Sequence, residues 1–168
     1  MDDKINRRGA IVTGLGGLAA FAFFASRSSV VAAAPRPVGA YKLTDAQWRM
    51  KLSPAAYAVL RQANTERPGS SALLKEHRIG KFHCAGCNWP LYSSKAKYES
   101  GTGWPSFWQA VPGGIGTLTD YDIGMARTEV HCRNCGGHLG HVFSDGPRPT
   151  GKRHCINGVA MTFKPGAA

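Results

Sequence analysis

The chain has 168 residues, of which 43% are hydrophobic and 18% charged, so it is long and apolar enough for one compact domain and is not a largely disordered protein. It carries 21 Lys and Arg against 10 Asp and Glu, a net charge of +11, which favours anionic partners. No long Lys/Arg run is present, and aromatic residues are not interleaved with basic ones, so an ordinary basic soluble protein is favoured over a nucleic-acid binder.

The first 34 residues differ in composition from the rest. Arg7 and Arg8 precede a mildly apolar run, Gly9–Ala25, and the small residues of VVAAAP follow it. A membrane span needs about 20 strongly apolar residues, so we expect residues 1–34 to be a signal peptide of the twin-arginine type, with an uncleaved anchor as the alternative. The protein would then be exported to the periplasm and keep no stable membrane span. Residues 35–43, rich in Pro and Gly, are a predicted linker.

Two short helices are predicted next. Thr44 followed by Gln47 is a capping-box pattern at the start of LTDAQWRMKL. Ser53 and Pro54 suit the N-cap and first position of a second helix, which the Pro-Gly pair of TERPGSS ends.

From Ile79 onward, short apolar pieces alternate with Gly, Pro, Asn and Asp. The pieces IGKFHC, TEVHC, GHVF, KRHC and GVAMTF are typical of strands of a few residues. We therefore predict one mainly β domain, residues 44–168, that begins with short helices.

Four of the five cysteines form two Cys-x-x-Cys pairs, Cys84 with Cys87 and Cys132 with Cys135. Two such pairs make a closed, tetrahedral, structural zinc site. Two disulfides, or a redox motif in one pair, are the alternatives in an exported protein. Two matched pairs with turn-like interiors favour zinc, and their long separation indicates that the metal joins distant parts of a larger domain.

The fifth cysteine, Cys155, has neighbours that favour chemistry over a buried core role. His154 precedes it, Asn157 follows two residues later, and the charges of Lys152 and Arg153 lower the pKa of a nearby thiol.

A possible active site also includes residues from two Gly-rich segments. His138 and His141, in GGHLGHVF, are candidate acids for an oxygen that a thiolate displaces. Trp104 and Phe107, in GTGWPSFW, are candidate pocket walls, with ordinary core aromatics as the alternative.

These motifs together resemble the methionine-R-sulfoxide reductases of the B type. TERPGSS, CAGCNWPLY, SGTGWPSFW, RTEVHCRNCGGHLGHVFSDG and PTGKRHCINGVAMTF occur in that order, and the similarity runs from about Leu43 to Phe163. The resemblance implies a small β-barrel-like domain of two antiparallel sheets with short N-terminal helices and a structural zinc site. It also implies reduction of methionine-R-sulfoxide, free or in oxidised proteins, to methionine.

The resemblance implies a role for each matching residue. Cys155 is the implied nucleophile, which attacks the sulfoxide sulfur and becomes a sulfenic acid. Trp104 is implied to pack against the substrate methyl group, and Asn157 to hold a substrate or a histidine. His138 and His141 are the implied acid and orienting group. The four paired cysteines are the implied zinc ligands.

Two positions depart from the family pattern. Thr102 stands where many relatives carry a cysteine that resolves the sulfenic acid, and Ile123 where others carry a histidine. We therefore expect an external, thioredoxin-like thiol to reduce Cys155. We expect a monomer, and a zinc-ribbon nucleic-acid-binding module is the alternative function.

Overall fold

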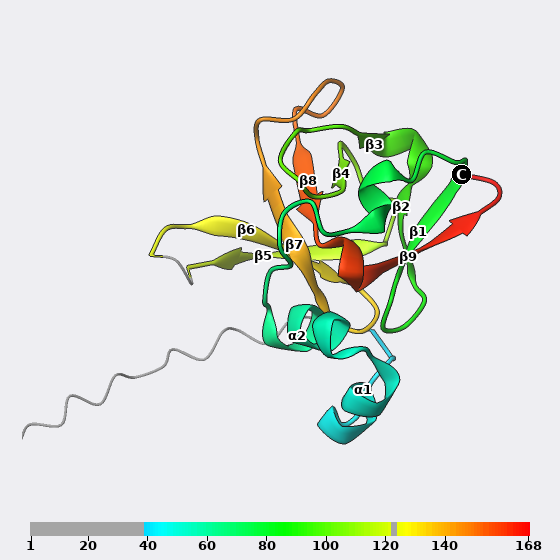
Figure 1. Ribbon diagram of the computed structural model, residues 1–168. Coiled ribbons are helices and arrows are strands. Elements are labelled where there is room, and N and C mark those ends of the chain that lie inside the picture. Colours follow the sequence, from blue (N-terminus) through cyan, green and yellow to red (C-terminus); the bar gives the residue numbers. More distant parts are fainter. Residues whose placement is uncertain (1–38, 122–123) are drawn as a thin grey trace, which may run out of the picture. The chain divides into compact units, whose positions relative to one another are not determined.

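The structure is a computed structural model that describes residues 39–121 and 124–168 (Figure 1). The predicted signal peptide, residues 1–34, lies outside the described residues, and so do the first part of the predicted linker and Ile123. Residues 39–43 form neither helix nor strand. Among the described residues, no helix has the length and apolar character needed to cross a membrane.

Both predicted helices are present, and their caps are those that the sequence indicates. Helix α1 spans Asp45–Lys51, and its capping box joins the Gln47 amide to the Thr44 hydroxyl at 3.3 Å and the Thr44 amide to the Gln47 side chain at 2.8 Å. Helix α2 spans Pro54–Gln62, and the Ser53 hydroxyl accepts a hydrogen bond from the Ala56 amide at 3.2 Å.

The described strands form two antiparallel sheets. The first has three strands in the order β2-β1-β9, which are β1 Gly80–Cys84, β2 Pro90–Ser93 and β9 Met161–Pro165. The second has six strands in the order β3-β4-β8-β7-β6-β5, which are β3 Lys97–Tyr98, β4 Ser106–Phe107, β5 Ile115–Asp120, β6 Arg127–Cys132, β7 His138–Phe143 and β8 Arg153–Ile156. Short 3-10 turns lie at η1 Ala72–Lys75, η2 Ser94–Ala96 and η3 Gly158–Ala160. The mainly β prediction is confirmed, although neither sheet closes into a barrel within the described part of the chain.

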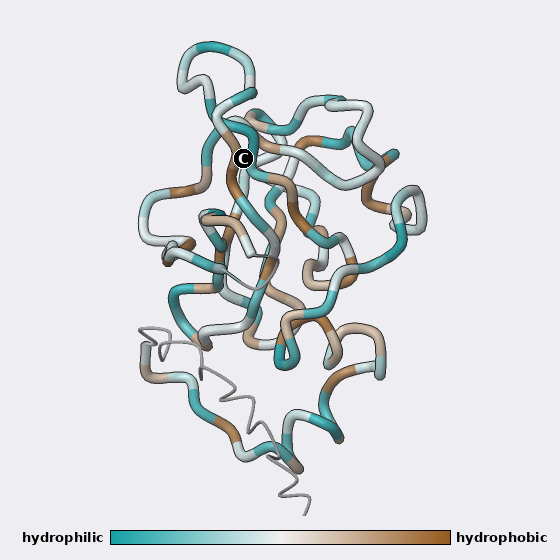
Figure 2. The backbone as a smooth tube through the Cα atoms, turned by 90° about the vertical axis from the view of Figure 1, so that its left-hand side faces the viewer, coloured by the Kyte–Doolittle hydropathy of each residue, from teal (hydrophilic) through white to brown (hydrophobic). Residues whose placement is uncertain are grey.

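Aromatic side chains fill the space between the sheets. Phe107 of β4 stacks on Tyr92 of β2 with ring centroids 4.3 Å apart, and it meets the edge of Phe82 of β1 at 5.0 Å. All three residues have no exposed surface. Hydrophobic and hydrophilic stretches alternate along the chain in Figure 2, and the loop between β7 and β8 is mostly hydrophilic.

The helices pack where the four paired cysteines lie. A β-carbon added at Gly137 would lie 2.8 Å from the Leu60 side chain, and one at Gly86 would lie 3.1 Å from Trp48. Arg61 of α2 also donates a hydrogen bond to the Cys135 carbonyl at 3.1 Å. Glycines beside both cysteine pairs therefore allow α1 and α2 to approach this end of the sheets, where α2 packs against β7 (Figure 1).

Candidate active site

The four paired cysteines converge on one point. Their sulfur atoms all lie within 4.8 Å of one another, with 3.7 Å between Cys84 and Cys135 and 3.5 Å between Cys87 and Cys132. A tetrahedral ion with metal–sulfur bonds of about 2.3 Å separates its sulfurs by about 3.8 Å, so the cluster fits a four-thiolate metal site. The described cysteines are all free thiols, so the structure does not pair them as disulfides.

Both Cys-x-x-Cys pairs adopt the same local turn. The Asn88 amide donates to the Cys84 carbonyl at 2.8 Å, and the Gly136 amide donates to the Cys132 carbonyl at 2.9 Å. Asn88 and Gly136 directly follow the second cysteine of each pair, and both have a left-handed backbone, with φ of 61° and 68°. This shared geometry turns both thiols of a pair toward the same point.

Cys155 lies in the middle of the six-stranded sheet, away from this cluster. In the strand register it is opposite Ser106 of β4 on one side and His141 of β7 on the other. Directly opposed residues of antiparallel strands project from the same face, with β-carbons about 4.5–5.5 Å apart. Cys155 therefore shares one face of the sheet with a hydroxyl and an imidazole.

The surroundings of Cys155 act on its ionisation in opposite directions. Burial raises the pKa of the Cys155 thiol, whereas the Thr102 hydroxyl and the Arg153 guanidinium lower it. The effect of burial therefore outweighs the lowering of the Cys155 pKa that was expected from Lys152 and Arg153. Arg153 is engaged by Asp145 through two hydrogen bonds of 3.0 and 2.8 Å, and Lys152 extends to the Ser144 hydroxyl at 3.0 Å.

A bulge in β7 brings the two candidate histidines to the same face. Val130 pairs with Gly140 and His131 pairs with His138, so Leu139 is an extra residue in β7. Residues three apart on a regular strand project from opposite faces, but the bulge changes this alternation. As a result the rings of His138 and His141 lie 5.4 Å apart, and Leu139 points into the core.

Each histidine is held by a carboxylate that the sequence did not single out. His141 Nε2 lies 2.6 Å from Asp120 Oδ2, and the same oxygen accepts a hydrogen bond from Arg127 at 2.6 Å. His138 Nδ1 lies 2.6 Å from the buried Glu129 carboxylate, and His138 Nε2 has no hydrogen-bond partner among the described residues. The His141 side chain is 13% exposed and that of His138 3%, so His141 is the more accessible of the two.

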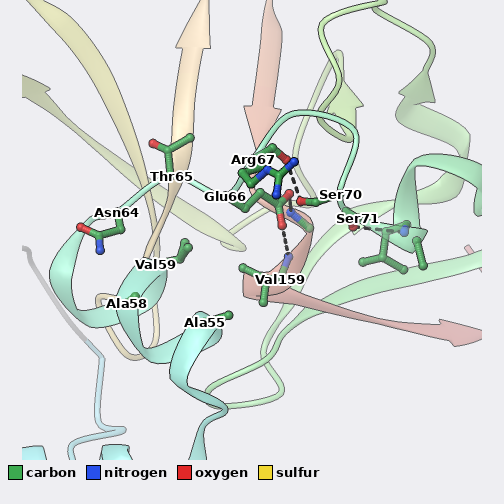
Figure 3. Close-up of a pocket in the computed structure, with 13 residues that line it drawn as sticks. Ala55, Ala58, Val59, Asn64, Thr65, Glu66, Arg67, Ser70, Ser71 and Val159 are labelled. Carbon is green, nitrogen blue, oxygen red and sulfur yellow. Dashed lines mark hydrogen bonds between the residues drawn. The ribbon is translucent and has the colours of Figure 1, made fainter.

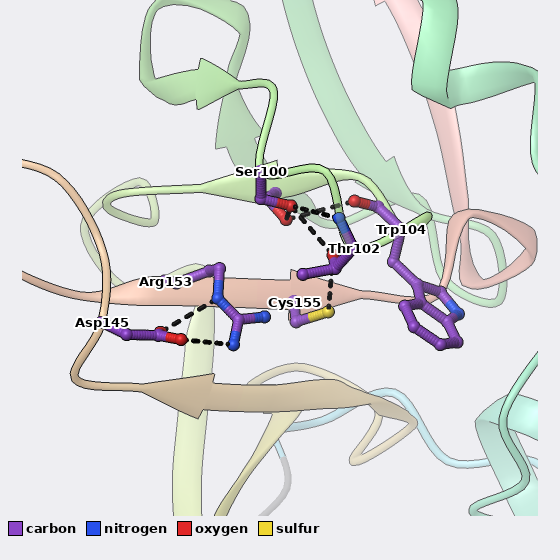
Figure 4. Close-up of polar contacts among 7 residues, drawn as sticks. Ser100, Thr102, Trp104, Asp145, Arg153 and Cys155 are labelled. Carbon is purple, nitrogen blue, oxygen red and sulfur yellow. Dashed lines mark hydrogen bonds and ion pairs between the residues drawn. The ribbon is translucent and has the colours of Figure 1, made fainter. Parts of the chain in front are cut away.

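Trp104 and Phe107 lie in different environments. Trp104 is half-buried in the loop before β4, two residues after Thr102, whose hydroxyl lies 3.8 Å from the Cys155 sulfur (Figure 4). Phe107 is fully buried between the two sheets. Ser106 shares the Cys155 face of β4, and strand alternation turns the next residue, Phe107, to the other face. The structure therefore gives Phe107 a core role and not the predicted place in a pocket.

Asn157 connects three segments and is buried. Its Oδ1 accepts a hydrogen bond from the Glu66 amide at 2.9 Å, and its Nδ2 donates to the Leu139 carbonyl at 2.9 Å. Glu66 in turn accepts hydrogen bonds from the Gly158 and Val159 amides at 2.5 and 3.0 Å. Its carbonyl accepts one from the Trp104 indole at 3.2 Å.

Glu66 also lines an open groove of about 580 Å³ between α2, the segment after it and η3 (Figure 3). Aliphatic side chains such as Val59 and Val159 form much of its wall. The Glu66 carbonyl accepts the hydrogen bond of the Trp104 indole, so Glu66 links this groove to Trp104.

Sequence reasoning missed Glu66, whose backbone contacts Asn157 and Trp104. It also missed Asp120 and Glu129, whose carboxylates hold the two histidines. Glu129 has a recognisable signal, because it alternates with His131 along the short strand TEVH and so has to face the same side as a histidine. Asp120 ends β5 and Glu66 lies in the loop after α2, and the sequence does not specify the contacts of either side chain.

The fold and the site define a class of protein: a mainly β domain with a four-cysteine metal-type cluster and a separate thiol that faces a carboxylate-held histidine. A thiol opposite a histidine that a carboxylate orients is an arrangement typical of thiol-dependent enzymes.

Comparison with known proteins gives the family. The model of the SelR domain family matches residues 52–165, more than half of the chain and a segment that includes all five cysteines. The chain therefore belongs to the SelR domain family, and the resemblance to the B-type methionine sulfoxide reductases is confirmed.

Curated relatives are similar over nearly their whole length. The peptide methionine sulfoxide reductase MsrB of Thiobacillus denitrificans is 50% identical over 123 residues, which are 73% of this chain and 93% of the relative. The MsrB of Bradyrhizobium diazoefficiens is 53% identical over 123 residues, 73% of this chain and 88% of the relative. The MsrB of Leifsonia xyli is 49% identical over 131 residues, 76% of this chain and 94% of the relative.

Proposed function

We propose that this protein reduces methionine-R-sulfoxide, free or in oxidised proteins, to methionine, with Cys155 as the nucleophile. The observation that carries the proposal is the position of Cys155 directly opposite His141, with Thr102 of the Trp104 loop in contact with its sulfur. Relatives about 50% identical that are named peptide methionine sulfoxide reductases support the same reaction.

His141 is the proposed acid and base. Because Asp120 accepts the Nε2 hydrogen, the neutral ring keeps its lone pair at Nδ1. Burial lowers the pKa of His141, with Asp120 opposing this, so the ring is neutral near pH 7 and accepts the Cys155 proton. His138 is more deeply buried and held by Glu129, and we assign it to the support of His141.

The reaction then transfers one oxygen atom. The Cys155 thiolate attacks the sulfoxide sulfur, and His141 returns the proton to the departing oxygen. The oxygen ends on Cys155 as a sulfenic acid, and methionine leaves, so the substrate sulfur is reduced as the cysteine is oxidised. An external thiol next attacks the Cys155 sulfur and releases water, and a second thiol restores Cys155 and leaves a disulfide.

Trp104 and Asn157 give the site its shape in this proposal. The Trp104 ring contacts the substrate methyl group, and Asn157 positions the segments around the site through Glu66 and Leu139. The site selects the R configuration because three groups of the substrate each require a different neighbour. The sulfoxide oxygen requires a proton donor, the methyl group an aromatic face, and the long arm an open groove.

A Zn²⁺ ion held by Cys84, Cys87, Cys132 and Cys135 is the proposed cofactor. It supplies structural cross-linking and no open coordination position, because four protein thiolates complete a tetrahedron. With these thiols on the metal and Thr102 beside Cys155, the proposed reductant is a thioredoxin-like protein outside the cytoplasm. We further propose export through the predicted signal peptide and action as a monomer.

A stereospecific assay tests the proposal. Purified protein with a dithiol is expected to reduce methionine-R-sulfoxide and leave the S form, and Cys155→Ser is expected to be inactive. His77→Gln, at an exposed position outside the site, is the matched control and keeps full activity. Full activity of Cys155→Ser contradicts the proposal.

Intact mass after one turnover without reductant tests the route of regeneration. One added oxygen atom supports a sulfenic acid that waits for an external thiol. A loss of two hydrogens with release of zinc contradicts it, because a zinc ligand would then have resolved Cys155.

A further inference from the structure

A chain of hydroxyl groups leads from the Cys155 sulfur to a backbone carbonyl. Cys155 Sγ lies 3.8 Å from Thr102 Oγ1, which lies 2.9 Å from Ser100 Oγ (Figure 4). Ser100 Oγ lies 2.7 Å from Ser106 Oγ, and the Ser106 hydroxyl donates to the Trp104 carbonyl at 3.1 Å. All three hydroxyls come from the segment that carries Trp104, between β3 and the first residue of β4.

Each hydroxyl has only one hydrogen to donate, and this fixes the direction of the whole chain. When Ser106 donates to the Trp104 carbonyl, Ser100 has to donate to Ser106, and Thr102 to Ser100. The Thr102 hydrogen is then used, so the contact with Cys155 is made by the thiol hydrogen. This direction therefore stabilises the neutral thiol.

A Cys155 thiolate has no hydrogen and requires the opposite direction. Thr102 then donates to the sulfur, Ser100 donates to Thr102, and Ser106 donates to Ser100. The only hydrogen bond lost is the one to the Trp104 carbonyl, and the new bond to a charged sulfur is stronger than the bond that the thiol made.

We propose that the Ser100–Thr102–Ser106 hydroxyl chain reverses its hydrogen-bond direction when Cys155 ionises, and that Thr102 thereby acts as the donor that stabilises the thiolate. This inference deepens the proposed function, since it concerns ionisation of the proposed nucleophile. Thr102 contacts the reacting sulfur, and Ser100 and Ser106 are positioning residues.

Other charged and titratable side chains also face Cys155, and the variants used to test the proposal leave them unchanged. They are His141 from β7, Arg153 from β8 with its partner Asp145, and Tyr98 from β3. The variants below leave all of these side chains in place, so a change in ionisation reports on the hydroxyls.

The test measures alkylation of the metal-bound protein by iodoacetamide as a function of pH, with adducts counted by intact mass. Only the thiolate reacts, so the midpoint of the rate profile is the pKa of Cys155. Cys155→Ser gives the background from the other cysteines. No sulfoxide is involved, so the outcome is independent of whether the protein reduces methionine sulfoxide.

Removing the donor and removing the far end of the chain have opposite expected effects. Thr102→Val, which keeps the shape and removes the hydroxyl, raises the midpoint by about one pH unit, and Thr102→Ser restores it. Ser106→Ala lowers the midpoint by about half a unit, because the thiol state loses two hydrogen bonds and the thiolate state loses one.

Ser100→Ala provides a second variant at a half-buried position, in case the buried Ser106 site does not tolerate alanine. Ser100→Ala is also expected to lower the midpoint. Without the Ser100 hydroxyl, the thiol state loses two hydrogen bonds. The thiolate state loses a net one, because Ser106 then donates to the Trp104 carbonyl again. An unchanged midpoint in Thr102→Val overturns the proposal. So does a failure of the folded serine variants to lower the midpoint.

Discussion

Neighbouring residues of β8 have unrelated roles because they lie on opposite faces of the sheet. Cys155 faces His141, whereas His154 faces the core and lies 3.2 Å from the Tyr92 hydroxyl through Nδ1. His154 beside the cysteine in the sequence suggested shared chemistry, and strand alternation separates the two. The side chain that matters to Cys155 comes from another strand.

His154 makes the stability of the protein depend on pH. Burial, with a smaller contribution from Lys152, lowers the pKa of His154 to about 4. The unfolded chain takes up this proton below about pH 6.5, whereas the folded protein does not until about pH 4, so stability falls as pH falls through this window. The expected contribution is at most about 3 kcal/mol.

Urea unfolding at several pH values between 7 and 4 measures this effect. His154→Gln is expected to lose less stability than the parent over the window, and the exposed His77→Gln variant is expected to follow the parent. If the unfolding free energies of the parent and of His154→Gln depend equally on pH, His154 is not the source of this pH dependence.

At the scale of elements, the bulge of β7 builds the histidine pair. Gly140 lies at this bulge with φ of 154°, and a β-carbon there would lie only 2.1 Å from the Cys155 carbonyl oxygen. Glycine at this position therefore lets β7 and β8 approach closely enough to place His141 opposite Cys155. The bulge is a property of two paired strands and not of either one alone.

Substituting Gly140 by alanine should push β8 away from β7. We expect a loss of about 2–3 kcal/mol of unfolding free energy and a reduction in reductase activity, because Cys155 itself moves. Gly151→Ala is the matched control: Gly151 also has a positive φ, 66°, but no atom lies within 4 Å of an added β-carbon. Its cost is about 1–2 kcal/mol, with activity retained. Full activity and stability of Gly140→Ala would contradict this account of the bulge.

At the scale of the whole described unit, the cysteine cluster joins the two sheets. Cys84 ends β1 of the three-stranded sheet, and Cys132 ends β6 of the six-stranded sheet. Helix α2 adds the Arg61 hydrogen bond to the Cys135 carbonyl. A metal held there would cross-link distant parts of the chain, which is the role that the long separation of the two pairs predicts.

Removal of the metal is therefore expected to destabilise the whole unit. Treatment with a chelator under reducing conditions should release about one zinc ion per chain and lower the melting temperature by more than about 10 °C. Calorimetry with metal analysis on the same sample measures both quantities. Cys87→Ser should reproduce the loss without chelator, and a melting temperature that does not respond to metal removal would contradict a structural role.

The local patterns of the sequence predicted much of the fold. Capping residues Thr44 and Ser53 placed the helix starts, and the short strands around Cys84, Cys132 and Cys155 are present. The role of Phe107 was not predictable from its motif, because the stacking partner Tyr92 comes from the other sheet. The predicted roles of Cys155 and His141 in catalysis stay predictions until the assays above are made.

The sequence by itself determined the family, the convergence of the four cysteines and the two capped helices, because these depend on residue identity, spacing and short-range hydrogen bonds. Only the tertiary structure decided which side chains face Cys155. The β7 bulge, the strand register and the hydroxyl chain through Thr102 arise from contacts between segments far apart in the chain. In a sheet, a shift of one residue reverses every side chain, so local patterns alone leave the faces undecided.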